Sequence, residues 1–382
     1  MKIVDVKTYA LAAPIEKPFY WAEGWVHGRY AMIVEVVTDE GLSGFGEAMC
    51  HGTQIPEPSR AVVDTVLKPL LVGRNPFDIA VLWDEMYHAV QPFARRGLGV
   101  NAISGVDVAL WDLLGKALNL PIYQLMGGAF RTELHPYATG FFRVEGGRYP
   151  EDAVAEAKRH VANGYDAMKI KIGYGPEDDS RVIRAVREAV GPDVRIMVDG
   201  NCAYSLGTAR RVLSMLEECD VYWFEEPLAP DDRKGYQALH NLSKVYIAMG
   251  ETEFGPVGFR EWIENRAVDV LQPDVCFSGG FTGCRAIINM AHAARIPSVP
   301  HIWGSGIALA ASMHLLAVIP NTPTTLEPVE PMLEYDQSEH PFRQELIGHV
   351  INREASGKVR IPEGPGLGVT VNRDVLREFA RG

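Results

Sequence analysis

Residues 167–172 read Ala-Met-Lys-Ile-Lys-Ile and residues 195–201 read Arg-Ile-Met-Val-Asp-Gly-Asn, two short apolar runs with polar residues at or near their ends. Similar runs recur at 222–225, 247–250, 270–272 and 298–301. Amphipathic segments of helical length lie between them, for example at 153–163, 180–190, 206–217 and 283–294. Strands that alternate with helices in this way predict a parallel sheet, either a closed eight-stranded barrel or an open doubly wound sheet.

An ionisable residue lies at or just after the end of each predicted strand. From Lys171 onward these residues are 28, 26, 26, 23 and 27 positions apart, and each interval is about one strand–helix unit long. A (β/α)8 barrel, the TIM-barrel type of α/β fold, gathers such residues in one ring at the carboxyl ends of its strands. No G-x-G-x-x-G motif follows a strand, as a dinucleotide site would require. The spacing therefore favours a barrel over residues 131–354, with a ring of Lys169, Lys171, Asp199, Glu225, Glu251, Asp274 and His301.

The first 130 residues follow a different pattern, which is typical of a smaller α+β domain. Alternating apolar residues at 31–37 and 42–47 flank a turn at 38–41 and predict a β-hairpin. Apolar residues with helical spacing follow at 62–67, 79–86 and 106–114. We expect this region to form a capping domain.

Composition narrows the possible partners. The 382 residues include 49 acidic and 37 basic ones, and a net charge of −12 disfavours binding to nucleic acid or anionic lipid. The five cysteines are widely spaced and predict neither a disulfide framework nor a zinc site. Charged residues near the N-terminus argue against a signal peptide, and the uncharged, proline-interrupted stretch 296–326 is expected to be a buried strand and helix. We therefore expect a cytoplasmic protein with no nucleic-acid or membrane partner.

Three of the ring residues are carboxylates on consecutive predicted strands: Asp199, Glu225 and Glu251. Clustered carboxylates repel one another unless a cation lies between them. Ligands that are all oxygen favour Mg²⁺, with Mn²⁺ as a plausible substitute. Asn201 lies on the same face as Asp199 and is a candidate for orienting a ligand, whereas Glu226 is expected to point away and to serve a supporting role.

Two further features of the ring predict acid–base chemistry. Lys169 and Lys171 project to the same side of one strand, and we expect their mutual repulsion and partial burial to lower a lysine pKa enough for one of them to act as a base. Asp274 and His301 follow adjacent strands, so the carboxylate can hold one imidazole nitrogen and raise the basicity of the other. The sequence thus predicts two acid–base groups around one cation.

The order of these motifs resembles the enolase superfamily, in its mandelate racemase-like subgroup. The resemblance covers nearly the whole chain, and 109–116, 125–128 and 365–368 also match that pattern. The stretches 136–140, 301–306 and 330–336 are most similar to the galactarolactone cycloisomerase type and to acid-sugar dehydratases. The resemblance implies a barrel with an N-terminal α+β capping domain that a C-terminal segment, about 355–382, completes. It also implies a homo-oligomer, commonly a dimer or octamer.

The resemblance assigns roles to individual residues. Asp199, Glu225 and Glu251 match the magnesium ligands, Lys171 matches the base on one face, and His301 with Asp274 matches the acid–base group on the other. Lys169 matches the lysine that contacts the substrate carboxylate. The resemblance also implies a glutamate after the eighth strand that hydrogen-bonds the substrate carboxylate. Glu327 is preferred because it lies 26 residues after His301, and Glu334 is the competing candidate because it lies in the downstream Leu-Glu-Tyr pattern, residues 333–335.

Together, these expectations predict an enzyme that uses Mg²⁺ to remove the proton next to the carboxylate of an acid sugar or its lactone. A β-elimination then follows. One alternative is a racemase or epimerase of a 2-hydroxy acid that uses the same two bases. A remote alternative is a carbohydrate-binding barrel without catalysis, which would require that no cation is bound and that both Lys169 and Lys171 lie at the surface. The aromatic and basic segment 19–29 is expected to be a loop. Its composition fits a loop that closes over the substrate, with Trp21, Trp25, His27 and Arg29 as candidate contacts, and equally fits an ordinary surface or interface loop.

Overall fold

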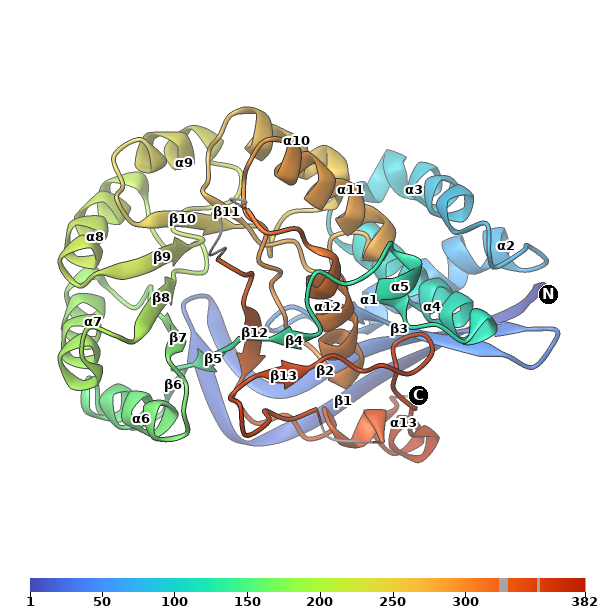
Figure 1. Ribbon diagram of the computed structural model, residues 1–382, viewed down its shortest axis with the longest axis horizontal. Helices are drawn as coiled ribbons and strands as arrows, with labels where there is room; N and C mark the ends of the chain where they lie inside the picture. Colours follow the sequence, from blue (N-terminus) through green and yellow to red (C-terminus); the bar gives the residue numbers. More distant parts are fainter. Residues whose placement is uncertain (323–328, 349–350, 382) are drawn as a thin grey trace.

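The computed structural model describes residues 1–322, 329–348 and 351–381. The larger part is a TIM-barrel type fold, in which a curved parallel sheet is surrounded by helices (Figure 1). Its strands, in the spatial order β11-β10-β9-β8-β7-β5-β12, are β5 (Pro136–Gly140), β7 (Ala167–Lys171), β8 (Arg195–Asp199), β9 (Val221–Glu225), β10 (Tyr246–Met249), β11 (Val270–Leu271) and β12 (Leu333–Asp336).

An eighth strand position lies between β11 and β12 in the chain. Ser298 forms a parallel bridge with Leu271, so the segment around residue 298 continues the barrel beyond β11. Every one of the eight positions contributes a residue to one buried apolar cluster: Tyr137, Ala167, Met197, Trp223, Ala248, Val270, Val299 and Met332. These side chains fill the interior, which makes the barrel a packed core.

Four of the connecting helices overlap the amphipathic segments predicted at 153–163, 180–190, 206–217 and 283–294. The helices between residues 151 and 293 present apolar residues to the sheet, and together with the outer faces of the strands they form the large barrel core. The last helix instead packs in a cluster that also contains residues of the N-terminal region. The uncharged stretch that begins at residue 296 first supplies a strand position and then the last helix. This helix is buried on all sides. The helices are α6 (Glu151–Ala162), α7 (Pro176–Val190), α8 (Leu206–Glu218), α9 (Arg233–His240), α10 (Gly255–Glu264), α11 (Gly280–Ala293) and α12 (Gly306–Val318).

The N-terminal region combines an antiparallel sheet, in the order β3-β2-β1-β6, with helices on one side (Figure 1). The predicted hairpin is present, since β2 pairs with β3. The strands are β1 (Ile3–Trp21), β2 (Gly24–Thr38), β3 (Ser43–Met49) and β6 (Arg143–Val144). The helices are α1 (Glu57–Val62), the π-helical turn Val63–Leu67, α2 (Lys68–Leu71), α3 (Ile79–Ala94), α4 (Leu98–Leu118) and α5 (Ile122–Leu125).

The expectation that segment 19–29 is a loop is wrong. It forms the tip of a long β-hairpin, in which Phe19 pairs with Val26 and Trp21 with Gly24 around a two-residue turn. The aromatic residues that suggested a closing loop are also residues that favour extended backbone, and here they pair across strands. The hairpin therefore reaches the barrel as a regular element.

The C-terminal segment returns to the N-terminal region. Leu11 forms an antiparallel bridge with Ala380, and the backbone N–H of Leu367 donates to the buried carboxylate of Asp112 in α4. The remaining elements are β4 (Glu133–Leu134), which pairs with β13 (Val359–Arg360), the 3-10 turn Glu345–Ile347 and α13 (Arg373–Phe379). Among the described residues, only α4 is long and apolar enough to cross a membrane, and 83% of its most apolar window is buried inside the protein.

Candidate active site

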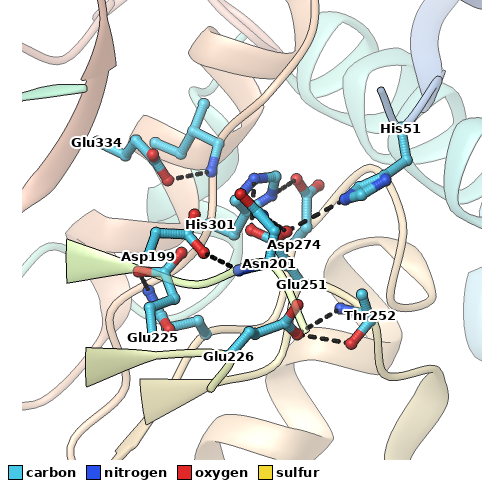
Figure 2. Close-up of polar contacts among 12 residues, drawn as sticks. His51, Asp199, Asn201, Glu225, Glu226, Glu251, Thr252, Asp274, His301 and Glu334 are labelled. Carbon is cyan, nitrogen blue, oxygen red and sulfur yellow. Dashed lines mark hydrogen bonds and ion pairs between the residues drawn. The ribbon is translucent and has the colours of Figure 1, made fainter. Parts of the chain in front are cut away.

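Three carboxylates meet at the carboxyl ends of neighbouring barrel strands (Figure 2). Asp199 ends β8, Glu225 ends β9 directly beside it, and Glu251 follows β10. All three are buried, and one oxygen from each lies within 4.8 Å of the others. Parallel strands in register carry residues at the same height of the barrel, which explains why positions 26 residues apart converge.

The cluster concentrates negative charge away from water. Burial, together with the neighbouring carboxylates of Asp199, Glu334 and Glu251, raises the pKa of Glu225 to about 8 against the opposing effect of Lys169. Charge of this kind is stabilised by a cation, and three buried carboxylates without sulfur or imidazole in the triad suit a hard divalent ion. The donor set therefore fits Mg²⁺ or Mn²⁺.

Both lysines of β7 are buried and point into this cluster. The Nζ atom of Lys169 lies 2.5 Å from Oε1 of Glu225 and 2.8 Å from Oε1 of Glu334. Lys171 donates to Asp199 and, over 3.0 Å, to Oδ1 of Asn201. Their burial removes the condition under which a non-catalytic carbohydrate-binding barrel would have been preferred.

The expected lowering of the lysine pKa is wrong for the structure as it stands. Burial does oppose the charged form, but Glu225 and Glu334 outweigh it and hold the pKa of Lys169 well above its ordinary value. The pKa of Lys171 is also raised, because the combined attraction of Asp199, Glu251 and Glu225 outweighs burial, the largest single effect, and the repulsion of Lys169. The prediction considered the two ammonium groups alone, whereas the carboxylates of the next strands surround both.

His301 contacts two carboxylates at once. Its Nδ1 atom lies 2.8 Å from Oδ2 of Asp274, and its Nε2 atom lies 3.1 Å from Oε2 of Glu251. Burial opposes protonation, but Glu251 and the hydrogen bond to Asp274 raise the pKa of His301 to about 10. Asp274 is held in turn by the backbone N–H of Cys276, so the imidazole has a fixed orientation.

Of the two candidate glutamates near the last strand, the structure places Glu334 in the cluster. It lies on β12, and its carboxylate accepts from Thr139 over 2.7 Å and from the backbone N–H of Ile302 over 3.1 Å, besides its contact with Lys169. Glu327 lies outside the described residues. The Leu-Glu-Tyr pattern around residue 334 was the sequence signal that pointed to this position.

A small cavity, with about 20 Å³ of free space, lies above the cluster. Trp21 at the hairpin tip lines it, and the indole Nε1 atom of this buried residue has no hydrogen-bond partner within the described part of the chain. Apolar residues of the hairpin and barrel also contribute. The lining is Phe19, Trp21, Val26, His51, Gly52, Phe142, Lys171, Asn201, Glu251, His301 and Trp303.

The other three candidate contacts from the hairpin are not brought to this cavity. Trp25 is partly exposed and stacks on His27, which lies beside a surface hollow near Pro14. Arg29 is buried, but it forms an ion pair with Asp336 and lies over the ring of Trp303. Alternate residues of a strand point to opposite faces, so only part of the hairpin can face the site.

Sequence reasoning missed several residues of the cluster. His51, which follows β3, places Nε2 3.2 Å from Oε1 of Glu251 (Figure 2). Gln272 and Trp223 both donate to Oε2 of Glu225. No periodic spacing relates His51 to the barrel ring, because it comes from the N-terminal region, and its position can be found only from the packing of that region on the barrel.

Glu226 lies next to the triad without joining it. Its carboxylate accepts from the backbone N–H and hydroxyl of Thr252, over 3.2 and 2.6 Å, as Figure 2 shows. Asn201 donates from Nδ2 to Oε1 of Glu251 over 3.0 Å, so this side chain bridges Lys171 and the triad.

A larger cavity, of about 440 Å³, lies at the opposite end of the barrel, among residues at the starts of β9, β10 and β11. It contains none of the residues of the triad or the lysine pair. The candidate active site is identified by the ionisable residues at the carboxyl ends of the strands and not by the size of the cavity.

Comparisons with known proteins agree with this assignment. The D-galactarolactone cycloisomerase of Agrobacterium fabrum is 37% identical over 379 residues, with 99% of each chain covered. The arabinonate dehydratase of Saccharolobus solfataricus is 33% identical, again with 99% of each chain covered. The crystal structure of the 3,6-anhydro-D-galactonate cycloisomerase from Zobellia galactanivorans superposes with a TM-score of 0.89 at 35% identity, covering both chains fully.

Two family models divide the chain between them. Residues 3–127 match the N-terminal domain of mandelate racemase and muconate lactonizing enzyme, and residues 152–375 match the enolase C-terminal domain-like family. Together with the fold and the carboxylate triad, these matches show that the chain is an enzyme of the enolase superfamily and belongs to its mandelate racemase/muconate lactonizing enzyme family.

Proposed function

We propose that the protein removes the proton next to the carboxylate of an acid sugar or its lactone and then eliminates a group from the neighbouring carbon. Cleavage of the bond from that carbon to the ring oxygen, which opens the ring and keeps the oxygen in the molecule, would make it a lactone cycloisomerase. Loss of hydroxide as water would make it an acid-sugar dehydratase. The observation that carries the proposal is that Lys171 and His301 line one cavity and contact different carboxylates of the triad, Asp199 and Glu251. The names of the similar enzymes support the substrate class.

The reaction requires charge stabilisation, because a carbon–hydrogen bond beside a carboxylate is very weakly acidic. In this proposal Asp199, Glu225 and Glu251 bind Mg²⁺, or Mn²⁺ in its place. When bound, this ion supplies positive charge beside the carboxylate oxygens, which become more negative as the proton leaves. Lys169 contributes an ammonium group to the same end of the substrate.

The two acid–base groups divide the proton transfers. Lys171 serves one face of the reacting carbon, and His301, oriented by Asp274, serves the other. Mg²⁺ bound by the triad would offset the carboxylates that raise the pKa of Lys171 and of His301. The deprotonated group could then remove the proton, and the protonated one could donate a proton to the departing oxygen. Elimination thus needs no further acid. We also propose that Trp21 and Asn201 contact the substrate.

Substitution of each base tests the assignment. Lys171→Ala and His301→Asn should each lower kcat by about 10²- to 10⁴-fold, the usual contribution of a positioned acid or base, while Mg²⁺ binding measured by calorimetry persists. Turnover close to wild type in either variant would contradict the assignment. Deuterium exchange or inversion in D₂O without loss of water or ring opening would instead support a racemase or epimerase.

A further inference from the structure

The end of β3 contacts three segments of the active site in succession. Glu47 binds the segment that follows His301, the backbone N–H of Met49 donates to the carbonyl of Cys276 over 2.9 Å, and His51 reaches Glu251. Glu47 and His51 are four residues apart, so their side chains point to one side of the strand and its extension, whereas Met49 makes its contact through the backbone. A single strand of the N-terminal region therefore touches the loop of Asp274, the loop of His301 and a carboxylate of the triad.

Glu47 makes the most extensive of these contacts. Its side chain is fully buried, and its carboxylate accepts from the hydroxyl of Ser305 over 2.5 Å and from the backbone N–H groups of Ser305 and Ala308 over 3.1 and 3.2 Å. Ala308 is in the first turn of α12, so the carboxylate lies at the positive end of that helix. A buried carboxylate with three donors is held firmly in place.

The segment between His301 and α12 has little freedom to adjust. Gly304 adopts φ +129°, and a Cβ atom there would lie 2.5 Å from Oε1 of Glu47. Ser305 also caps α12 by accepting from the N–H of Ile307 over 3.2 Å, and α12 itself is buried on all sides. His301 is only four residues from Ser305, so an anchor at Ser305 fixes the far end of the loop that carries the imidazole.

We propose that Glu47 is a positioning residue that sets the location of His301 through the 302–305 segment. The expected effect of Glu47 on catalysis rests on the proposed function, whereas its effect on the position of His301 does not. Without the carboxylate, Ser305 and the start of α12 lose their partner from β3, the loop relaxes, and the imidazole leaves its dual contact with Asp274 and Glu251. The three carboxylates of the triad do not touch Glu47 and keep their geometry.

The test compares Glu47→Gln, which preserves size and one carbonyl acceptor, with Ser305→Ala, which removes the hydroxyl from the other side of the contact. Asp112→Asn is the matched control, since Asp112 is an equally buried carboxylate that accepts backbone N–H groups of Phe45 and Leu367, far in the sequence from the His301 loop. The readouts are the imidazole N–H signal of His301 in ¹⁵N-histidine-labelled full-length protein, assigned with His301→Asn, and kcat, KM and Mg²⁺ affinity.

Glu47→Gln and Ser305→Ala should shift or broaden the His301 signal and lower kcat by about 10- to 100-fold, because a displacement of about 1 Å can have an effect of this size. KM and Mg²⁺ affinity should change by less than about threefold, and Asp112→Asn should leave the signal in place. An unchanged His301 signal in both variants would overturn the proposal, whatever their stability. Absence of wild-type turnover on acid sugars would contradict the proposed function, and the spectroscopic comparison would still decide the role of Glu47.

Discussion

The ammonium group of Lys169 and the carboxylate of Glu334 lie 2.8 Å apart, although their strands, β7 and β12, flank β5 on opposite sides. This contact joins the last strand of the barrel to the carboxylate triad, since Lys169 also binds Glu225. Lys169 on β7 therefore links a carboxylate of β9 to a carboxylate of β12.

This pairing predicts that Glu334 is the glutamate that acts with Lys169. Glu334→Gln removes the negative charge beside the ammonium group and should lower kcat/KM for an acid-sugar substrate by at least about tenfold, the effect of losing roughly 1.4 kcal/mol. Glu327→Gln, assayed in parallel, is expected to have the smaller effect. A larger loss in Glu327→Gln would restore the assignment that sequence spacing favoured.

The carboxylate triad predicts one divalent-cation site per chain. Isothermal titration calorimetry with MgCl₂ should show saturable binding to the wild type and none to Glu225→Gln at the same concentrations, because each triad member supplies a ligand oxygen. Glu226→Gln is the matched control, since this neighbouring buried carboxylate binds Thr252 and is absent from the triad. Equal losses in both variants would show that the assay reports general damage to the site.

The two hairpin residues Arg29 and Trp21 should behave differently. Arg29→Met leaves the buried Asp336 with one cation fewer and removes the contact with Trp303, so we expect a loss of about 3 kcal/mol in the free energy of unfolding and an unchanged KM. Trp21→Phe removes the unpaired indole N–H from the cavity and should raise KM. A raised KM with full stability in Arg29→Met would place Arg29 in the substrate site.

The buried His314 in α12 predicts a specific dependence of stability on pH. Burial lowers the pKa of His314 from 6.5 to about 4, so between these values the unfolded chain binds a proton that the folded chain does not. The free energy of unfolding should therefore fall as the pH drops from 6.5 to 4, by up to about 3 kcal/mol from this group.

Chemical denaturation of the wild type and His314→Phe at several pH values isolates this contribution. The phenyl ring can retain the stacking on Tyr123, so the variant should lose less stability than the wild type as the pH falls. Parallel pH profiles for the two proteins would contradict the prediction.

Much of the barrel could be predicted because its signals are local and repeat. The strand starting at Ala167 was placed to within one residue of β7, and the ends of β8 and β9 carry Asp199 and Glu225 as the spacing indicated. The regular length of a strand–helix unit converts sequence distance into position around the barrel. The convergence of the triad followed from that regularity alone.

The remaining features depend on packing between distant segments. The predicted direction of the pKa shift of Lys171 was wrong because this shift depends on nearby carboxylates such as Asp199. The distance from Asp199 to Nζ is set only when the barrel is assembled. The prediction of a loop at 19–29 was wrong because aromatic side chains are compatible both with a loop and with paired strands. His51 and Glu47 reach the site only because the N-terminal sheet packs on the barrel, and no sequence period records that contact.

The central claim is tested most directly by incubating the wild-type protein with Mg²⁺ and a panel of aldonates, aldarates and their lactones in D₂O, followed by NMR. We predict that at least one of these substrates is converted to a product that has lost water or opened its ring, and that Lys171→Ala and His301→Asn do not form it. Proton exchange or inversion at the carbon next to the carboxylate, with no elimination product from any member of the panel, would contradict the account.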